Sequence, residues 1–388
     1  MFRDLVRMLG NQASGGGLAW DQVRAFALQL ATNGVSEPNP DPLERITLEQ
    51  LARVAELQVG QLTGLPTSVT GRPITIVPVT RALWIHGATD AYRPLFEALA
   101  GSLSAAATAP PGPEEAGDPM AAMLHQVMGA AAPMLLSIMA GSMLGHIAQR
   151  SFGRYDLPIP RPPSDELIIV SPNVREFGEA WSLSHDDLLL WVCLHEVAHH
   201  TVLGVPHVGA TLTALLTAYA GGFEPGGGGG ALGGLEDKLS DLSFDDPGAL
   251  AELQASFADP HVLLGAMQSE AQRAILPRLE ALVAVVAGYV DWVMDSVGAG
   301  LIGGYTQLTE ALRRRRVEDK DSDRFVEQLL GLELRQSAYD RGTAFIDGVV
   351  ERAGPGALER LWTSDRELPT PAEIDAPGLW LARIDLPD

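Results

Sequence analysis

Cysteine and basic residues are both scarce in this chain. The only cysteine among 388 residues is Cys193, so the chain can form neither an internal disulfide nor a four-cysteine zinc site. Lysine and arginine number 27 against 49 aspartate and glutamate residues, which leaves a formal net charge of −22. A field of that sign repels nucleic-acid backbones and anionic lipid. We therefore expect a protein of the reducing cytoplasm with no nucleic-acid partner.

Signals for export or membrane insertion are also weak. The N-terminus lacks the basic segment, apolar core and small-residue cleavage site of a secretory signal. Residues 127–147 carry no charged side chain and are long enough to span a membrane. However, Pro133 and Ser137 interrupt this segment, and methionine and alanine carry much of its hydrophobicity. We therefore predict a buried core helix and no membrane partner, and we expect Gly141 and Gly145 to admit a closely packed neighbour.

The remaining composition is that of a folded globular protein. Hydrophobic residues make up 46% of the chain and charged residues 20%, which excludes wholly disordered and collagen-like classes. Strand signals are confined to residues 74–79 and 167–170. Apolar residues recur at the three- and four-residue intervals of amphipathic helices in 20–32, 47–62, 91–103, 120–150, 184–203, 277–297 and 323–353. This pattern predicts a mainly α-helical α+β fold with a small sheet.

Three segments rich in glycine, proline or small residues predict loops or flexible linkers, at residues 34–42, 105–119 and 221–234. The last segment includes the glycine run 226–230. That run lacks the following Lys-Ser/Thr and the flanking strand and helix of a phosphate-binding loop. We therefore interpret it as a linker and not as a nucleotide site.

The pattern His-Glu-x-x-His at residues 195–199 is the constellation that predicts chemistry. Before it, Ser184 is a suitable helix N-cap and residues 188–194 are all apolar, whereas Gly204 and Pro206 end the predicted helix. The motif therefore lies in the last turns of a buried helix. Imidazoles and a carboxylate without partners are costly in such a place, and a metal ion would supply the partner.

The spacing of the motif suits zinc. His195 and His199 are four residues apart and project from one helix face about 6 Å from each other, close enough to bind one tetrahedral Zn²⁺. Glu196 lies beside that face, where a carboxylate can take a proton from a metal-bound water and pass it on. The alternative is that the histidines donate to backbone carbonyls or lie on an exposed helix end.

The third zinc ligand stays open at this point, and further histidines are one possible source. The extended motif with a third histidine fails, because position 205 is valine and His207 misses the register by two residues. His200 points about 100° away from His199 around the helix. We expect His200 to face solvent or to lie outside the shell of direct ligands.

Acidic residues of the predicted helix 277–297 are a second possible source of the third ligand. Glu280, Asp291 and Asp295 fall near one face of that helix, in apolar surroundings. We predict Asp291 as the third ligand and Asp295 as a group that orients a histidine or caps the site. The competing interpretation is that either carboxylate caps a helix or pairs with an arginine.

Two further features favour structural roles. Cys193 lies two residues before His195 on a different helix face, which indicates a small core residue and not a nucleophile. The arginine run 313–316 precedes further charged residues, and this pattern is typical of a solvated helix end.

Beyond the motif, several phrases of the sequence form an ordered set that is more specific than the motif alone. They are Ser151-Phe-Gly-Arg-Tyr-Asp156, Ile168-Ile-Val-Ser-Pro-Asn173, Leu190-Trp-Val-Cys-Leu-His-Glu-Val-Ala-His199, Gly288-Tyr-Val-Asp-Trp-Val-Met-Asp295, Leu330-Gly-Leu-Glu-Leu334 with Tyr339 and Gly342, and Leu368-Pro-Thr370 with Glu373-Ile374. Together they resemble a zincin-like family of uncharacterised, actinobacterial-type proteins. Its members are described as zinc-dependent metallohydrolases, some of them associated with biosynthesis of a deazaflavin coenzyme.

The resemblance implies a single zincin-like domain over residues 1–388 with a family-specific fold, and a protein that does not enter a membrane. One departure bears on the site. The family reads Glu-Gly-His-Gly-Asp before this point, whereas this chain has Ala287-Gly288-Tyr289-Val290-Asp291. Position 287 therefore cannot supply the family's glutamate, which favours Asp291 as a ligand or a site that has lost catalysis.

These observations predict a zinc-dependent hydrolase that cleaves a peptide or amide bond. His195, His199 and Asp291 bind Zn²⁺, and Glu196 is the general base for a zinc-activated water. The alternative is a non-catalytic binding protein on a zincin scaffold, with an empty or structural metal site. The sequence defines neither the substrate nor the oligomeric state.

Overall fold

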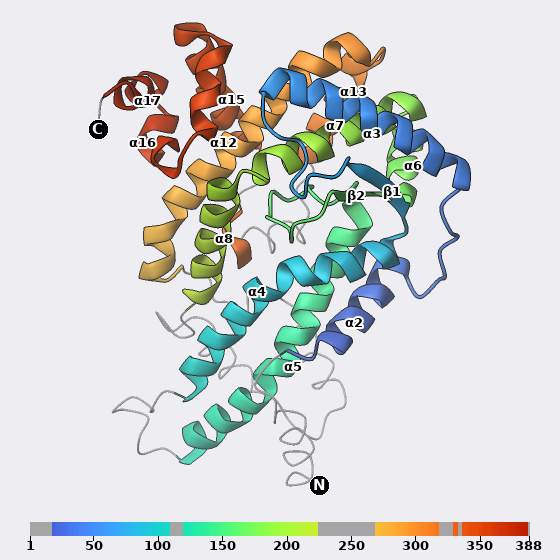
Figure 1. Ribbon diagram of the computed structural model, residues 1–388. Helices are drawn as coiled ribbons and strands as arrows, with labels where there is room; N and C mark the ends of the chain where they lie inside the picture. Colours follow the sequence, from blue (N-terminus) through green and yellow to red (C-terminus); the bar gives the residue numbers. More distant parts are fainter. Residues whose placement is uncertain (1–17, 109–118, 224–267, 318–328, 333–335, 387–388) are drawn as a thin grey trace.

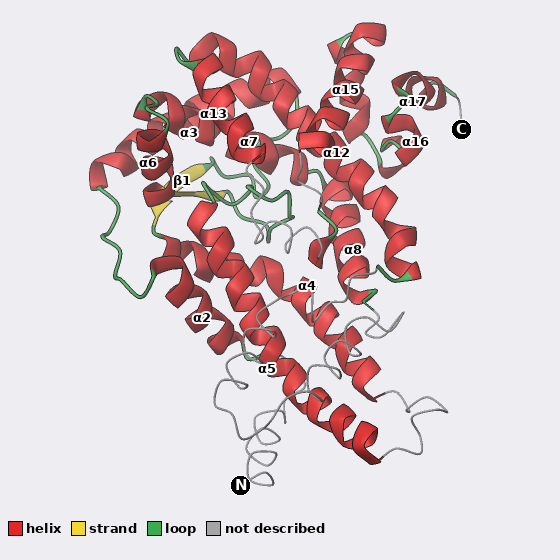
Figure 2. Cartoon of the chain, turned by 180° about the vertical axis from the view of Figure 1, so that it is seen from behind, coloured by secondary structure: helices red, strands yellow, loops and turns green. Residues whose placement is uncertain are grey.

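The computed structural model describes residues 18–108, 119–223, 268–317, 329–332 and 336–386 (Figure 1). Helices dominate these ranges, and two strands form a small sheet (Figure 2). The elements, in chain order, are α2 (Trp20–Thr32), α3 (Pro42–Thr63), β1 (Thr75–Val79), α4 (Arg81–Thr108), α5 (Pro119–Arg150), β2 (Glu166–Val170), α6 (Ser171–Ala180), α7 (His185–Leu203), α8 (Pro206–Gly221), α12 (Glu270–Leu301), α13 (Tyr305–Val317), α15 (Gln336–Ala353), the 3₁₀ helices η1 (Pro355–Trp362) and η2 (Asp365–Glu367), α16 (Pro371–Ile374) and α17 (Pro377–Ile384). The predicted mainly helical α+β class is confirmed.

The sheet pairs β1 and β2 in parallel, from Thr75 opposite Glu166 to Val79 opposite Val170. A parallel pair needs a long crossover, and α4 and α5 provide it between the two strands. The β2 backbone also reaches toward the site, because Val170 N donates to the Phe152 carbonyl oxygen at 2.8 Å. Both predicted strands are therefore present, and together they support the loop that follows α5.

The helix boundaries follow local capping chemistry. The Ser184 side chain accepts from Asp187 N at 3.4 Å, and α7 begins at the next residue, as its sequence predicts. Helix α12 begins earlier than the predicted 277, because Ser269 and Gln272 form a reciprocal capping box ahead of it. Pro277 then lies inside the helix, where its missing N–H removes one backbone hydrogen bond without ending the element.

Two layers of helices meet around the sheet. In Figure 1, α2, α4 and α5 lie together at one end of the molecule, and α13 and α15 lie at the other end. Helices α5 and α2 pack closely through the predicted glycine pair, since a Cβ at Gly141 would lie 2.8 Å from the Val23 carbonyl oxygen. Helices α12 and α15 meet in the same way at Gly288 and Gly342, where a Cβ at Gly342 would overlap a backbone oxygen of α12.

Long apolar helices of this fold lie in its core. Among the described residues, α12 is apolar and long enough to cross a membrane, and the bent pair of α7 and α8, which turn by 87° at their break, passes the same test. However, 78% of the apolar window of α12 is buried. The charge-free segment 127–147 falls inside α5, and its side chains Ala140, Met143 and Leu144 are buried.

The predicted linkers have different outcomes. Residues 34–41 form a loop between α2 and α3, and Asp41 caps α3 by accepting from Leu43 N at 2.9 Å. Residues 105–108 belong to α4, whereas most of the predicted linkers 105–119 and 221–234 lies outside the described residues. The single domain over 1–388 stays a prediction.

A candidate metal and catalytic site on helix α7

The site is built on the C-terminal half of α7, which is buried almost all round. An apolar stretch precedes the motif, and Val192, Cys193 and Leu194 are fully buried. Cys193 is therefore a core residue, as predicted, and burial raises the pKa of its thiol. This packing holds α7 in place and therefore fixes the backbone that carries the polar side chains of the motif.

His195 and His199 face each other from adjacent turns of α7, with their ring centroids 4.3 Å apart. Trp191 stacks on His195 with a centroid separation of 4.8 Å. Burial lowers the pKa of His195 to about 4 and that of His199 well below its usual value. Both imidazoles are therefore neutral at physiological pH, which is the form that binds a metal.

The tautomer of His199 is set by its own helix. Its Nδ1 lies 3.1 Å from the carbonyl oxygen of His195, so a proton on Nδ1 is donated to that oxygen. The Nε2 lone pair is then free to bind a metal ion. The ring is also held in place by Tyr155, which stacks on it at a centroid separation of 6.2 Å and an interplanar angle of 9°.

Glu196 is fully buried beside the histidine pair. Its two carboxylate oxygens accept from the backbone N–H groups of Arg154 at 2.7 Å and Tyr155 at 3.1 Å. Burial raises the pKa of Glu196 to about 7, although these hydrogen bonds act in the opposite direction. A carboxyl group of that pKa can accept and release a proton near neutral pH.

The loop 151–156 is a functional element that the motif analysis did not identify. A Cβ at Gly153 would overlap the carboxyl group of Glu196, so only glycine lets the loop approach this closely. The Gly153 carbonyl oxygen accepts from Trp84 Nε1 at 2.6 Å, which anchors the loop to α4. The only sequence signal for this role is the glycine within the phrase Ser-Phe-Gly-Arg-Tyr-Asp.

Asp156 closes the same loop. Its carboxylate accepts from the N–H groups of Phe152 at 2.7 Å and Gly153 at 2.9 Å, and its charge also reaches His195. Arg315 of α13 lies over the Phe152 ring at 3.7 Å, and its guanidinium is 3.4 Å from Asp156. Asp156 is therefore a second acidic group next to the histidines that the motif did not reveal.

The structure brings Asp291 near both histidines but gives it a different partner. Its charge reaches His195 and His199, yet Arg316 donates to both of its carboxylate oxygens at 3.0 Å. Arg316 itself lies over the Tyr339 ring at 4.0 Å. The competing interpretation, a carboxylate paired with an arginine, thus describes Asp291 in this conformation.

The arginine run 313–316 was predicted as a solvated helix end, and this is wrong for its second half. The side chains of Arg315 and Arg316 are only 19% and 22% exposed and reach the site from α13. Arg313 and Arg314 are exposed, as predicted. Burial of two guanidinium groups is possible because Asp156 and Asp291 pair with them.

The remaining candidate ligands do not join the histidine pair. Asp295 accepts from the Tyr305 hydroxyl at 2.6 Å, and His207 lies at the start of α8 with a buried Nε2 that has no hydrogen-bond partner among the described residues. Glu280 is placed on α12. Within the described residues, no group of three or more His, Cys, Asp or Glu side chains is arranged to hold a metal ion.

His200 is buried and does not face solvent, which leaves the other expected position, outside the shell of direct ligands. Its Nδ1 lies 3.0 Å from the Tyr155 hydroxyl, and its Nε2 lies 3.4 Å from Asp165. Asp165 also accepts from Ser68, Val69 and Thr70, and therefore ties the loop before β1 to α7.

A helix that carries two neutral imidazoles and a buried glutamate as His-Glu-x-x-His, in a mainly helical fold, defines a protein of the zincin-like class. The chain belongs to the zincin-like metallopeptidase family, whose model matches residues 18–381. The predicted family resemblance is therefore confirmed.

A solved structure supports the same fold. The chain is similar to a protein from Chloroflexus aurantiacus that is described as "a putative hydrolase with a novel fold", with a TM-score of 0.65 and 22% sequence identity. The match covers 96% of this chain and 100% of that chain. No curated protein matches the chain.

Proposed function

We propose that the protein is a cytoplasmic zinc-dependent hydrolase that cleaves a peptide or amide bond. The observation that carries this proposal is the neutral imidazole pair of His195 and His199 next to Glu196, whose pKa is raised to about 7. Membership of a metallopeptidase family supports hydrolysis as the reaction class. The acidic chain and the buried long helices are compatible with this location.

The residues fit zinc in part. Two imidazole nitrogens suit Zn²⁺, and Asp291 would provide the third ligand, which leaves one position for water. Bound zinc would lower the pKa of that water to about 7 and polarise a carbonyl group. Glu196, whose carboxylate the N–H groups of Arg154 and Tyr155 hold in position, would take up the proton that the attacking water gives up and would pass it to the departing amine.

This ligand set requires Asp291 to exchange partners. In the structure its two oxygens are both engaged by Arg316, so binding a metal through Asp291 breaks two charge-assisted hydrogen bonds. The Arg316 guanidinium lies 4.0 Å from the centre of the Tyr339 ring, which would remain as its partner after this exchange. Arg316 is therefore a competitor of the metal for Asp291.

The metal content of protein purified without chelator or affinity metal tests the proposal. We expect about one zinc per chain, lost in His195→Ala and in Asp291→Ala. Asp295→Asn is the matched control and keeps its zinc, because Asp295 bonds to Tyr305. Arg316→Gln binds zinc more tightly, because Asp291 is then released.

The ion pair between Arg316 and Asp291 also favours a second function, a non-catalytic binding protein on the zincin scaffold. If that pair is permanent, the site offers only two histidines, and position 287 holds an alanine that cannot bind a metal. In that case the protein takes up no zinc even when zinc is added. The same measurement therefore separates the two functions.

A further inference from the structure

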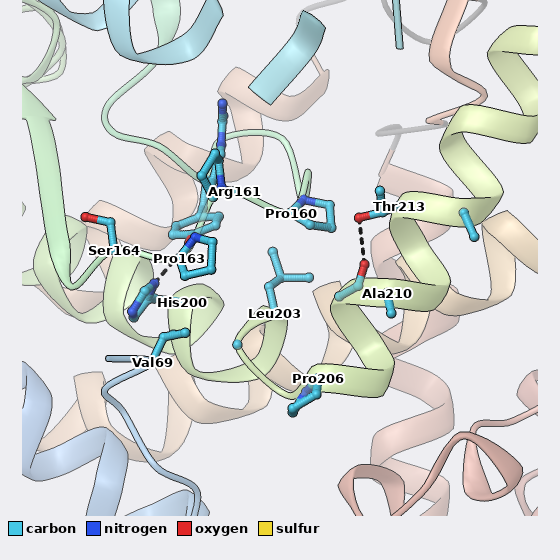
Figure 3. Close-up of a pocket in the computed structure, with 15 residues that line it drawn as sticks. Val69, Pro160, Arg161, Pro163, Ser164, His200, Leu203, Pro206, Ala210 and Thr213 are labelled. Atoms are coloured by element: carbon cyan, nitrogen blue, oxygen red, sulfur yellow. Dashed lines mark hydrogen bonds between the residues drawn. The ribbon is translucent and has the colours of Figure 1, made fainter. Parts of the chain in front are cut away.

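A pocket of about 540 Å³ has Tyr155 and His200 in its lining but neither His195 nor His199. Its walls come from the loop 160–164, the end of α7 and the start of α8 (Figure 3). Much of the lining is apolar, including Pro160, Pro163 and Leu203. Polar side chains also line it, those of Arg161, His200, Tyr155, Ser164 and Thr213. The pocket thus combines apolar walls with a single guanidinium group.

Arg161 forms no ion pair with a carboxylate of the described residues, and its other contacts leave one donor unsatisfied. Its Nη2 donates to the Arg154 carbonyl oxygen, and its guanidinium lies 5.2 Å from the centre of the Tyr92 ring. Its Nε is buried and has no hydrogen-bond partner within the described parts of the chain. A buried donor without a partner is costly, and an anionic ligand would satisfy it.

A second guanidinium strengthens the positive charge next to the pocket. Arg154 is close enough to Arg161 for the two charges to repel, and the charges of Glu196 and Glu166 reach Arg154 as well. The acids nearby are already engaged. Glu196 accepts two backbone N–H groups, and Asp165 is surrounded by donors and by His200. Neither of these two acids forms an ion pair with Arg161, because their close partners are His195 and His200.

The pocket is connected to the catalytic glutamate through one residue. Tyr155 lines the pocket with its side chain, and its backbone N–H donates to Glu196 at 3.1 Å. Tyr155 is thus the residue that stands between a ligand in the pocket and Glu196, which does not itself line the pocket. The ligand's polar end is recognised by Arg161, and its apolar part by the prolines and Leu203.

We propose that this pocket is a substrate subsite that binds a free carboxylate attached to an apolar group, as in the C-terminal residue of a peptide. This inference rests on the proposed hydrolase function and narrows its substrates to those with a free carboxylate beside the cleaved bond. Arg161 would bind the carboxylate, and the apolar walls would bind the adjoining side chain.

The test is equilibrium binding of N-acetyl-L-leucine and N-acetyl-L-leucinamide to the full chain, by calorimetry in the presence of a chelator. We expect the acid to bind at least 10-fold more tightly than the amide. Arg161→Gln reduces binding of the acid at least 10-fold, whereas Arg175→Gln, at an exposed position on α6, leaves it unchanged. Equal binding of acid and amide, or unchanged binding in Arg161→Gln, overturns the proposal.

A second variant tests the pocket without removing the arginine. Ala210 lines the pocket from an exposed position of α8, so Ala210→Trp fills it with little effect on the core. This variant loses binding of the acid and keeps the unfolding midpoint of the parent protein. Binding that survives Ala210→Trp shows that the ligand lies elsewhere and also overturns the proposal.

The outcomes separate this inference from the proposed function. Binding in chelator needs no zinc. Selective binding of the acid by a protein that never takes up zinc would therefore support the carboxylate subsite and contradict the proposed zinc-dependent hydrolase. The converse result is a protein that binds zinc and hydrolyses amides but binds acid and amide equally well. That result would support the hydrolase proposal and contradict the carboxylate subsite.

Discussion

Two neighbouring histidines of α7, His199 and His200, are both buried but differ in their partners. His200 is engaged at both ring nitrogens, by the Tyr155 hydroxyl at 3.0 Å and by Asp165 at 3.4 Å. His199 is engaged only at Nδ1, by a carbonyl oxygen of its own helix, and in the described residues its Nε2 has no hydrogen-bond partner. The first arrangement stabilises a fold, and the second keeps a lone pair for a ligand.

The two buried acids next to this part of α7, Asp165 and Glu196, differ in the same way. Burial alone would raise the pKa of Asp165, but hydrogen bonds from Thr70, Val69 and Ser68 outweigh it, and the pKa lies well below its usual value. Glu196 accepts only two backbone N–H groups, and burial raises its pKa to about 7. The Asp165 carboxylate is thus held in place in its charged form, whereas the Glu196 carboxyl group can exchange a proton near neutral pH.

The largest expected effect comes from Glu196→Gln. Glutamine keeps the size and the acceptor oxygen of the side chain but cannot take up a proton, so hydrolysis falls at least 100-fold. Zinc content stays the same, because Glu196 is not a proposed ligand. Turnover of a peptide library and metal analysis check both statements. Glu179→Gln, at an exposed position, is the control and has no effect; hydrolysis that persists in Glu196→Gln would sink the assigned role.

Asp165→Ala has the next largest effect, and it acts on stability. The change leaves buried donors of the loop before β1 and of His200 without their acceptor, which costs about 3 kcal/mol of unfolding free energy. Denaturant titration measures this loss. Asp90→Asn, whose exposed ion pair with Arg93 spans 4.0 Å, changes it by less than about 0.5 kcal/mol. A small loss of stability in Asp165→Ala would contradict the structural role that distinguishes Asp165 from Glu196.

Gly153→Ala tests whether the loop 151–156 positions Glu196. The new Cβ would overlap the carboxyl group of Glu196, so either the loop or the carboxylate must move. We expect a loss of about 2 kcal/mol in stability and a clear fall in hydrolysis. Gly87→Ala is the matched control, since its Cβ meets nothing within 4 Å; it leaves hydrolysis intact and, because alanine favours a helix over glycine, raises stability by up to about 1 kcal/mol. Normal activity in Gly153→Ala would show that the loop does not position Glu196.

The sequence predicts the parts of this site that depend on local chemistry. Ser184 caps α7, an apolar run buries it, and the spacing of four residues places His195 and His199 together. Each of these features is fixed within a few turns of one helix, so the residue pattern is sufficient to predict it.

The remaining parts depend on residues far apart in the chain. Arg315 reaches Asp156 across 159 positions, and whether an arginine is buried depends on such a distant partner. Backbone donors such as Tyr155 N carry no signature in the side-chain pattern. For these reasons the composition of an arginine run predicts exposure, and the partner of Asp291 could not be chosen in advance.

The smallest expected effect is on the pH dependence of stability in the metal-free protein. Burial lowers the pKa of His195 to about 4 from an unfolded value of about 6.5, so between these values the unfolded chain binds more protons and stability rises with pH. Burial raises the pKa of Glu196 to about 7 from about 4.3 in the unfolded chain, so in that range the folded chain binds more protons and stability falls with rising pH.

The two contributions have opposite signs, and single substitutions therefore separate them. Relative to the parent protein, between about pH 5 and 6, Glu196→Gln gains a slope of about 1 kcal/mol per pH unit toward higher stability at higher pH, and His195→Asn shifts the slope by a similar amount in the other direction. Denaturation midpoints measured in chelator across this range test both. Parallel curves for the three proteins would mean that His195 and Glu196 titrate in the folded protein as they do in the unfolded chain. Glu196 would then no longer differ from Asp165 as a group that exchanges a proton near neutral pH.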